Sequence, residues 1–185
     1  GGRRARRAMG AGVWSSYLEL STHFRQVGDL QHVYAISSWD EAAMMPDGGG
    51  PSRGQALATL GVVIHNMVTH EKIGNWLDAC SNLDLDEWQR ANVREIRREY
   101  ENLACLPSDL IHASSIASSR CEQTWRKCRA DNDWDTMKPL LEEVVNLARQ
   151  EATIRSEHSG LSRYDSLLES FEPGMRSVKV DQLFT

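Results

Sequence analysis

Apolar residues recur every three or four positions along most of the chain, and this spacing limits the fold more than any other feature. Between Trp14 and Trp39 it places six side chains on one helical face, those of Tyr17, Leu20, Phe24, Val27, Leu30 and Tyr34. No short alternating run of β-branched residues bounded by turn residues occurs, so we expect no strands. The sequence therefore predicts an all-α fold of long amphipathic helices in antiparallel packing.

Proline, glycine and capping residues predict where the first helices begin and end. Ser16 and Glu19 have the spacing of a capping box, so we expect the first helix to start there. Pro46 and the run Asp47-Gly48-Gly49-Gly50 should end it, because proline lacks the helical N–H donor and glycine tolerates positive φ. Pro51 can open a second helix. A phosphate cradle at the glycines is the less favoured alternative, because no GxxxxGK[ST] motif and no preceding strand accompany them.

Four more helices follow from the same signals. The third is short and carries the apolar positions of Ile73–Cys80. Asp84 with Glu87 predicts the cap of a fourth helix. Pro107 opens a fifth, and the polar run Asp131-Asn132-Asp133 separates it from a sixth.

Both ends of the chain differ from this helical body. Residues 1–13 are rich in arginine and contain neither an acidic residue nor an apolar run, so we expect a disordered basic leader, with a transit peptide as the alternative. Ser177–Phe184 resembles the opening of a capped helix that has only about two turns when the chain reaches Thr185. We therefore expect residues 14–185 to be a helical segment of a longer protein, with apolar stripes that need partners elsewhere in it.

Charge and cysteine content exclude several classes of protein. The sequence has 21 Lys and Arg against 26 Asp and Glu. Four arginines lie in residues 1–13, which leaves 17 basic against 26 acidic residues, a formal charge of about −9, for the rest. Such an acidic body argues against nucleic acid as a partner, and the lack of any run of 18 apolar residues argues against a membrane span. The four cysteines match neither a disulfide framework nor a CxxC zinc motif, so we expect reduced thiols in a soluble, cytoplasmic protein.

The histidines and cysteines do not indicate a catalytic site. A zinc-hydrolase helix carries histidines at i and i+4, whereas His65 and His70 are five apart, or roughly 140° around a helix axis. A complete metal enzyme built on these two residues is the least favoured hypothesis. Cys121 and Cys128 share a helix face, but we expect both to be buried as small apolar side chains. We predict no catalytic residue and no metal ligand in this chain.

Tryptophan is abundant, with six residues in the chain. At apolar positions of helices its large side chain usually packs in a core. Trp39 differs because it immediately precedes Asp40 and the turn that begins at Met45 and Pro46. A rigid ring beside a loop can form the edge of a groove. We therefore predict that Trp39, Asp40, Met45 and Pro46 form the rim of a substrate groove.

Six stretches of the sequence follow one another in a characteristic order. They are Ser38-Trp39-Asp40 leading to Met45-Pro46, Arg53-x-Gln55 with Ala58-Thr59-Leu60, Asp86–Glu95, Leu106-Pro107-Ser108-Asp109-Leu110, Phe171–Met175 and Asp181–Phe184. Together, from about residue 15 to the end, they resemble the carboxypeptidase Taq family of metallocarboxypeptidases. The family usually has Gln where this chain has Glu41 and Thr where it has Ala43.

The resemblance implies a mainly helical enzyme of several hundred residues that removes C-terminal amino acids from peptides with broad specificity. Its zinc or cobalt ion would sit on an HExxH helix with a further Glu ligand, and its members are expected to form homodimers. This chain corresponds to the N-terminal helical region, which covers one side of a long substrate groove. No HExxH occurs in the 185 residues, so we expect no metal to be bound by this chain and no activity without the C-terminal half. The alternative is a free-standing helical protein-interaction domain without catalysis.

Overall fold

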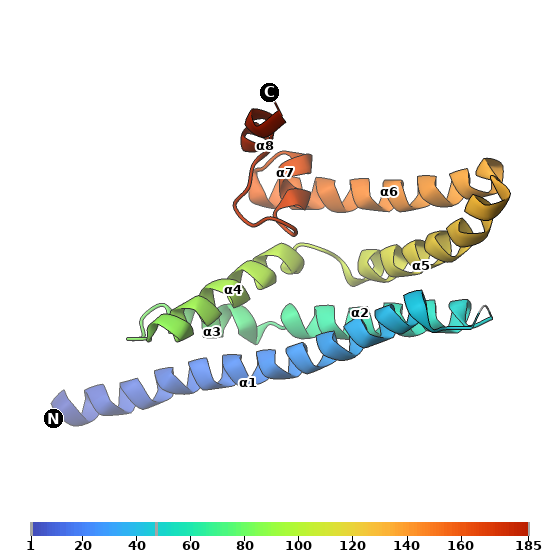
Figure 1. Cartoon of the computed structure of the whole chain (residues 1–185). Coiled ribbons are helices and arrows are strands. Elements are labelled where there is room, and N and C mark those ends of the chain that lie inside the picture. Colours follow the sequence, from blue (N-terminus) through green and yellow to red (C-terminus); the bar gives the residue numbers. More distant parts are fainter. Residues whose placement is uncertain (1, 47, 185) are drawn as a thin grey trace. The chain divides into compact units, whose positions relative to one another are not determined.

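The computed structural model describes residues 2–46 and 48–184, with side chains from residue 15 onward. Within these ranges the secondary structure is helical and contains no strand, which confirms the predicted all-α fold (Figure 1). The helices are α1 (Gly2–Ala43), α2 (Gly50–Val68), α3 (Lys72–Cys80), α4 (Glu87–Ala104), α5 (Ser108–Asp131), α6 (Trp134–Ser159), α7 (Arg163–Leu168) and α8 (Ser177–Phe184). None of the described helices is long and apolar enough to cross a membrane.

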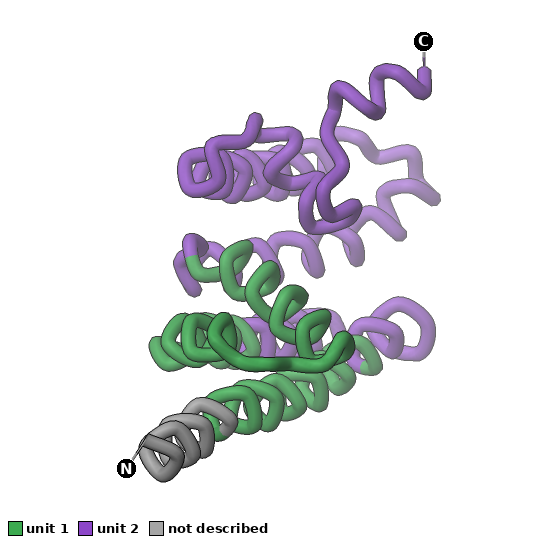
Figure 2. The backbone as a smooth tube through the Cα atoms, turned by 90° about the vertical axis from the view of Figure 1, so that its left-hand side faces the viewer, with its two compact units in different colours: residues 1–36, 63–104 green, residues 37–62, 105–185 purple. Residues whose placement is uncertain are grey.

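Two compact units make up the chain (Figure 2). Unit 1 comprises Gly1–Ile36 and Val63–Ala104, and unit 2 comprises Ser37–Val62 and Cys105–Thr185. Helices α1 and α2 therefore contribute residues to both units. The disordered basic leader predicted for residues 1–13 stays a prediction.

The core of unit 1 forms where the apolar faces of α1, α3 and α4 meet. Leu20, Ile73 and Leu77 are fully buried there, as their helical spacing predicted. Tyr17 lies in the same cluster, and its hydroxyl accepts a hydrogen bond from Asn92 Nδ2 at 3.2 Å. Burial of each large aliphatic side chain contributes roughly 1.5–3 kcal/mol to stability, so this cluster holds three helices together.

Unit 2 is built around α5 and α6, which lie side by side and are joined by a tight corner (Figure 1). Asn132 adopts a left-handed conformation with φ 53° and ends α5. Asp133 then caps α6 by accepting the backbone N–H of Thr136 at 3.1 Å. The predicted break at these residues is confirmed.

Cys121 and Cys128 are buried between α5 and α6 against Met137, as the sequence predicted. Burial raises the pKa of the Cys121 thiol, an effect that nearby Arg120 partly opposes. The thiol therefore stays protonated at neutral pH and acts as a small apolar group.

Three sequence-based expectations about helix boundaries differ from the structure. The predicted start of the first helix at Ser16 is wrong, because α1 begins at Gly2 and Ser16 lies within it. Serine followed by an acid three residues later marks a helix start only where the preceding residues break the helix, and here they continue it. The predicted cap of α4 at Asp84 is also wrong, because the capping box lies at Asp86 and Gln89. The short helix α7, which Ser162 caps by accepting the N–H of Asp165, was not expected.

The expected burial of tryptophan also fails at three positions. Trp88, Trp125 and Trp134 are 82%, 42% and 58% exposed. Trp88 and Trp134 lie in the first turns of α4 and α6, where a helix has fewer neighbours than in its middle. The ring of Trp125 is instead covered in part by the guanidinium of Arg129, whose central carbon lies 5.4 Å from the ring centroid.

The capping box of α4 leads to a test that separates the two candidate caps. Asp86 Oδ1 accepts the N–H of Gln89 at 2.9 Å, and Gln89 Oε1 accepts the N–H of Asp86 at 3.0 Å. We expect Asp86→Ala to lower the free energy of unfolding by about 1 kcal/mol, because it leaves an N-terminal N–H without its acceptor. Asp84→Ala should change it by less than about 0.5 kcal/mol. Urea denaturation measures both, and a larger loss for Asp84→Ala would contradict this assignment.

Candidate functional site

The predicted rim lies at the end of α1 and in the turn that follows it. Trp39 is 58% exposed, Pro46 is exposed and Met45 is partly buried. The carbonyl of Asp40 accepts the backbone N–H groups of Met44 and Met45 at 2.9 and 2.8 Å. The first has the spacing of an ordinary helical hydrogen bond and the second spans five residues, so together they close the last turn of α1, which ends at Ala43.

Asp40 itself is bound by the next helix. Its carboxylate forms an ion pair with Arg53 of α2, at 2.6 Å between Oδ2 and Nη1. The same Nη1 donates to the carbonyl of Ser37 at 2.8 Å. Both side chains remain about a third exposed, so the ion pair alone contributes little to stability. Its geometric effect is to connect the two helices on either side of the loop.

Glu41 is a further polar residue of this site, and it is not among the residues that the sequence predicted for the rim. Its side chain is only 6% exposed. Glu41 Oε1 accepts hydrogen bonds from Ser119 Oγ at 2.5 Å and from Gln123 Nε2 at 2.8 Å, both on α5. One signal was present in the sequence, because Glu41 follows Tyr34 by seven positions and so continues the inward face of the first helix.

Two glycines of α2 lie against these α5 side chains. A Cβ atom on Gly50 would lie 1.6 Å from Gln123 Oε1, and one on Gly54 would lie 2.8 Å from Ser119 Oγ. Gly50 and Gly54 are four residues apart on α2, and Ser119 and Gln123 are four apart on α5, so each pair occupies one helix face. The absence of side chains at these glycines therefore permits α2 to approach the polar pair on α5.

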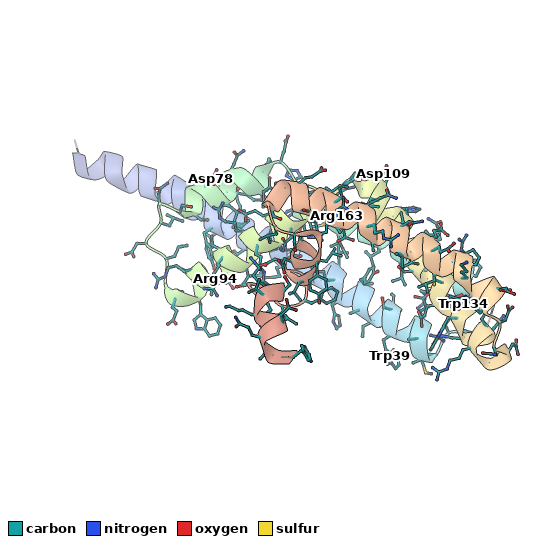
Figure 3. All side chains as sticks on the ribbon, turned by 90° about the horizontal axis from the view of Figure 1, so that it is seen from above. Trp39, Asp78, Arg94, Asp109, Trp134 and Arg163 are labelled. Carbon is teal, nitrogen blue, oxygen red and sulfur yellow. The ribbon has the colours of Figure 1, made fainter. Side chains whose placement is uncertain are left out.

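The side chains around this loop divide into exposed apolar groups and carboxylates that have protein partners. Figure 3 shows Trp39 near the end of α1, at the same end of unit 2 as Trp134. The exposed side chains beside the loop are mainly apolar, and Met44 adds a 66% exposed thioether to them. The carboxylates of Asp40 and Glu41 are occupied by protein partners. The role of Trp39, Asp40, Met45 and Pro46 as a rim remains a prediction.

The histidines considered for a metal site are not assembled into one. His65 is buried, whereas His70 is exposed and its Nδ1 accepts the backbone N–H of Lys72 at 3.2 Å. Among the side chains described, those of residues 15–46 and 48–184, no three from His, Cys, Asp or Glu are grouped so that they could hold a metal ion. The described part of this chain therefore does not fit a resident metal.

A family model matches most of the chain. The model describes the carboxypeptidase Taq (M32) metallopeptidases and matches residues 19–185. Among characterised proteins, thermostable carboxypeptidase 1 of Thermus thermophilus is 30% identical over 181 residues, covering 92% of this chain and 36% of the relative. Thermostable carboxypeptidase 1 of Pyrococcus furiosus is 26% identical and is covered to 33%. The chain thus spans about a third of the length of these relatives.

Solved structures of the same kind share the fold. Metallocarboxypeptidase 1 of Trypanosoma cruzi superposes with a TM-score of 0.76 at 33% sequence identity, covering 92% of this chain and 34% of that protein. An M32 carboxypeptidase from Deinococcus radiodurans gives a TM-score of 0.72 at 25% identity. Helix order and packing therefore agree with about a third of each structure.

The close approach of α2 to α5 predicts that replacing Gly54 by alanine lowers the free energy of unfolding, which is the reverse of the usual effect in a helix. Alanine normally stabilises a helix interior by about 1 kcal/mol over glycine. Gly54→Ala should instead lower the free energy of unfolding by about 1–3 kcal/mol, because its Cβ overlaps Ser119, which cannot move without losing Glu41. Gly28→Ala on α1, where nothing lies within 4 Å of the new Cβ, should raise it by roughly 0.5–1 kcal/mol. Chemical denaturation that found both variants equally stabilised would disprove the close contact.

Proposed function

Because the chain belongs to the carboxypeptidase Taq (M32) metallopeptidase family, we propose that it is the N-terminal part of a metal-dependent carboxypeptidase. The complete enzyme would release amino acids from the C-termini of peptides with broad specificity. The observation that carries this proposal is the family match over residues 19–185, together with relatives that are themselves carboxypeptidases.

The metal ion and the general base of the reaction would be supplied by the part of the enzyme outside these 185 residues. Metallopeptidases need a metal ion to polarise the scissile carbonyl and its bound water, and a general base beside it. This chain contains no HExxH motif, and its described residues form no metal-binding group. We propose that a zinc or cobalt ion is held by the remaining part of the enzyme, that the enzyme is cytoplasmic, and that this chain alone is inactive.

This chain would contribute to substrate binding. We propose that Trp39, Asp40, Met45 and Pro46 form part of the rim of the substrate groove. The support is that Trp39 and Pro46 are exposed beside a turn that is hydrogen-bonded to Asp40, a position where loops on rigid helices commonly bind ligands. The apolar side chains of Trp39, Met45 and Pro46 favour contacts with apolar side chains of a peptide.

An activity assay tests the proposed function. The 185-residue chain and the longer product of its reading frame are purified with zinc or cobalt, and release of the C-terminal residue from a blocked dipeptide is followed. We expect no release by the chain alone and release by the longer product, abolished by a chelator and restored by the metal. A longer product that folds with metal bound and yet cleaves nothing would contradict the proposal and favour the interaction domain.

The proposed rim has its own test in the longer product. We expect Trp39→Ala to raise KM about tenfold and to change kcat by less than about twofold, because it removes contact area without touching the reacting atoms. Trp88→Ala removes an equally large and more exposed ring in unit 1 and should leave both constants unchanged. Equal effects of the two substitutions on KM would argue against a rim at Trp39.

A further inference from the structure

Glu41, Ser119 and Gln123 form a polar node between α1 and α5 in unit 2. Glu41 Oε1 accepts from both α5 side chains, and Gln123 Nε2 also lies 3.3 Å from Ser119 Oγ. A buried carboxylate loses its hydration and is tolerated only where hydrogen bonds replace it. The two donors meet this requirement and thereby hold the last turn of α1 against α5.

The position of Glu41 couples this node to the loop. Glu41 is adjacent to Asp40, whose carbonyl accepts the N–H groups of Met44 and Met45. On the other side, Arg53 binds both the carboxylate of Asp40 and the carbonyl of Ser37. The start of the loop is therefore fixed from two directions, by α5 through Glu41 and by α2 through Arg53.

Gly50 and Gly54 of α2 leave no room for a side chain beside the node. Any side chain at Gly50 would displace Gln123, and any side chain at Gly54 would displace Ser119. α2 therefore packs directly against both donors of Glu41. Residues of three helices thus meet around the node, with Glu41 on α1, its two donors on α5 and the two glycines on α2.

We propose that Glu41 is a positioning residue for substrate binding, which acts as a hydrogen-bond acceptor for Ser119 and Gln123 and so holds the loop beside Trp39 in place. This inference rests on the proposed function, because it assigns the loop to the substrate groove. The requirement is for an acceptor oxygen at this position, and the negative charge is not needed. Glu41→Gln should therefore preserve the function of the node, whereas Glu41→Ala should abolish it.

The kinetic test uses the longer, metal-loaded enzyme. We expect Glu41→Ala to raise KM about tenfold while kcat changes by less than about twofold, because a misplaced rim weakens binding and leaves the reacting groups in place. Glu41→Gln should stay within about twofold of the unsubstituted enzyme in both constants. Glu122→Ala is the matched control, because Glu122 is the exposed neighbour of Gln123 and binds Arg126 of its own helix across one turn.

Hydrogen exchange of the Met44 and Met45 amides gives a second readout that needs no activity. In Glu41→Ala both amides should exchange about tenfold faster than in the unsubstituted protein, and in Glu41→Gln at the original rate. Gln123→Ala removes only one of the two donors, so it should give a smaller increase in the exchange rate of these amides. This variant also provides the test if Glu41→Ala does not fold.

Three outcomes would overturn the proposal: unchanged KM and exchange in Glu41→Ala, equal losses in Glu41→Gln and Glu41→Ala, or a loss confined to kcat. An inactive unsubstituted enzyme would instead contradict the proposed function, while the exchange data would still decide whether the node holds the loop.

Discussion

A carboxylate buried between helices must have its hydrogen bonds satisfied, and this requirement governs the geometry of the site in unit 2. Transfer of such a group from water costs several kcal/mol unless donors replace the lost solvent. Glu41 obtains these donors from α5, and α2 carries glycine at the two positions that face them. Residues of three helices therefore meet around one buried carboxylate.

Unit 1 depends on a different constraint. Its helices are joined by apolar side chains such as Leu20, Ile73 and Leu77, which are completely buried and carry no directional requirement. Apolar burial contributes stability in proportion to area and tolerates small changes in orientation. A hydrogen-bonded carboxylate does not tolerate such changes in orientation, because a hydrogen bond weakens steeply as its angle changes. Each unit is thus held together by a different kind of contact.

Much of the architecture could be predicted because helices produce local signals. The stripe through Tyr17, Leu20 and Val27, the turn after Pro46 and the break at Asn132 all depend on spacing or on single residues with unusual backbone preferences. Boundaries were less predictable. Asp84 and Asp86 both offer a capping side chain, and only the hydrogen bonds of Gln89 distinguish them. The exposure of Trp88 and Trp134 depends on how completely neighbouring elements cover the first turn of a helix. The spacing of apolar residues along the sequence does not contain this information.

The sequence by itself determined that this chain is helical, where its main turns fall, and that it resembles a metallocarboxypeptidase in a succession of short stretches. Tertiary structure alone decided that Glu41 is buried, that Arg53 binds Asp40 and that Gly54 contacts Ser119. The physical reason is the range of each interaction. Helical periodicity joins residues three or four apart, whereas these contacts join residues as far apart as Glu41 and Gln123, and their partners exist only after the helices have packed.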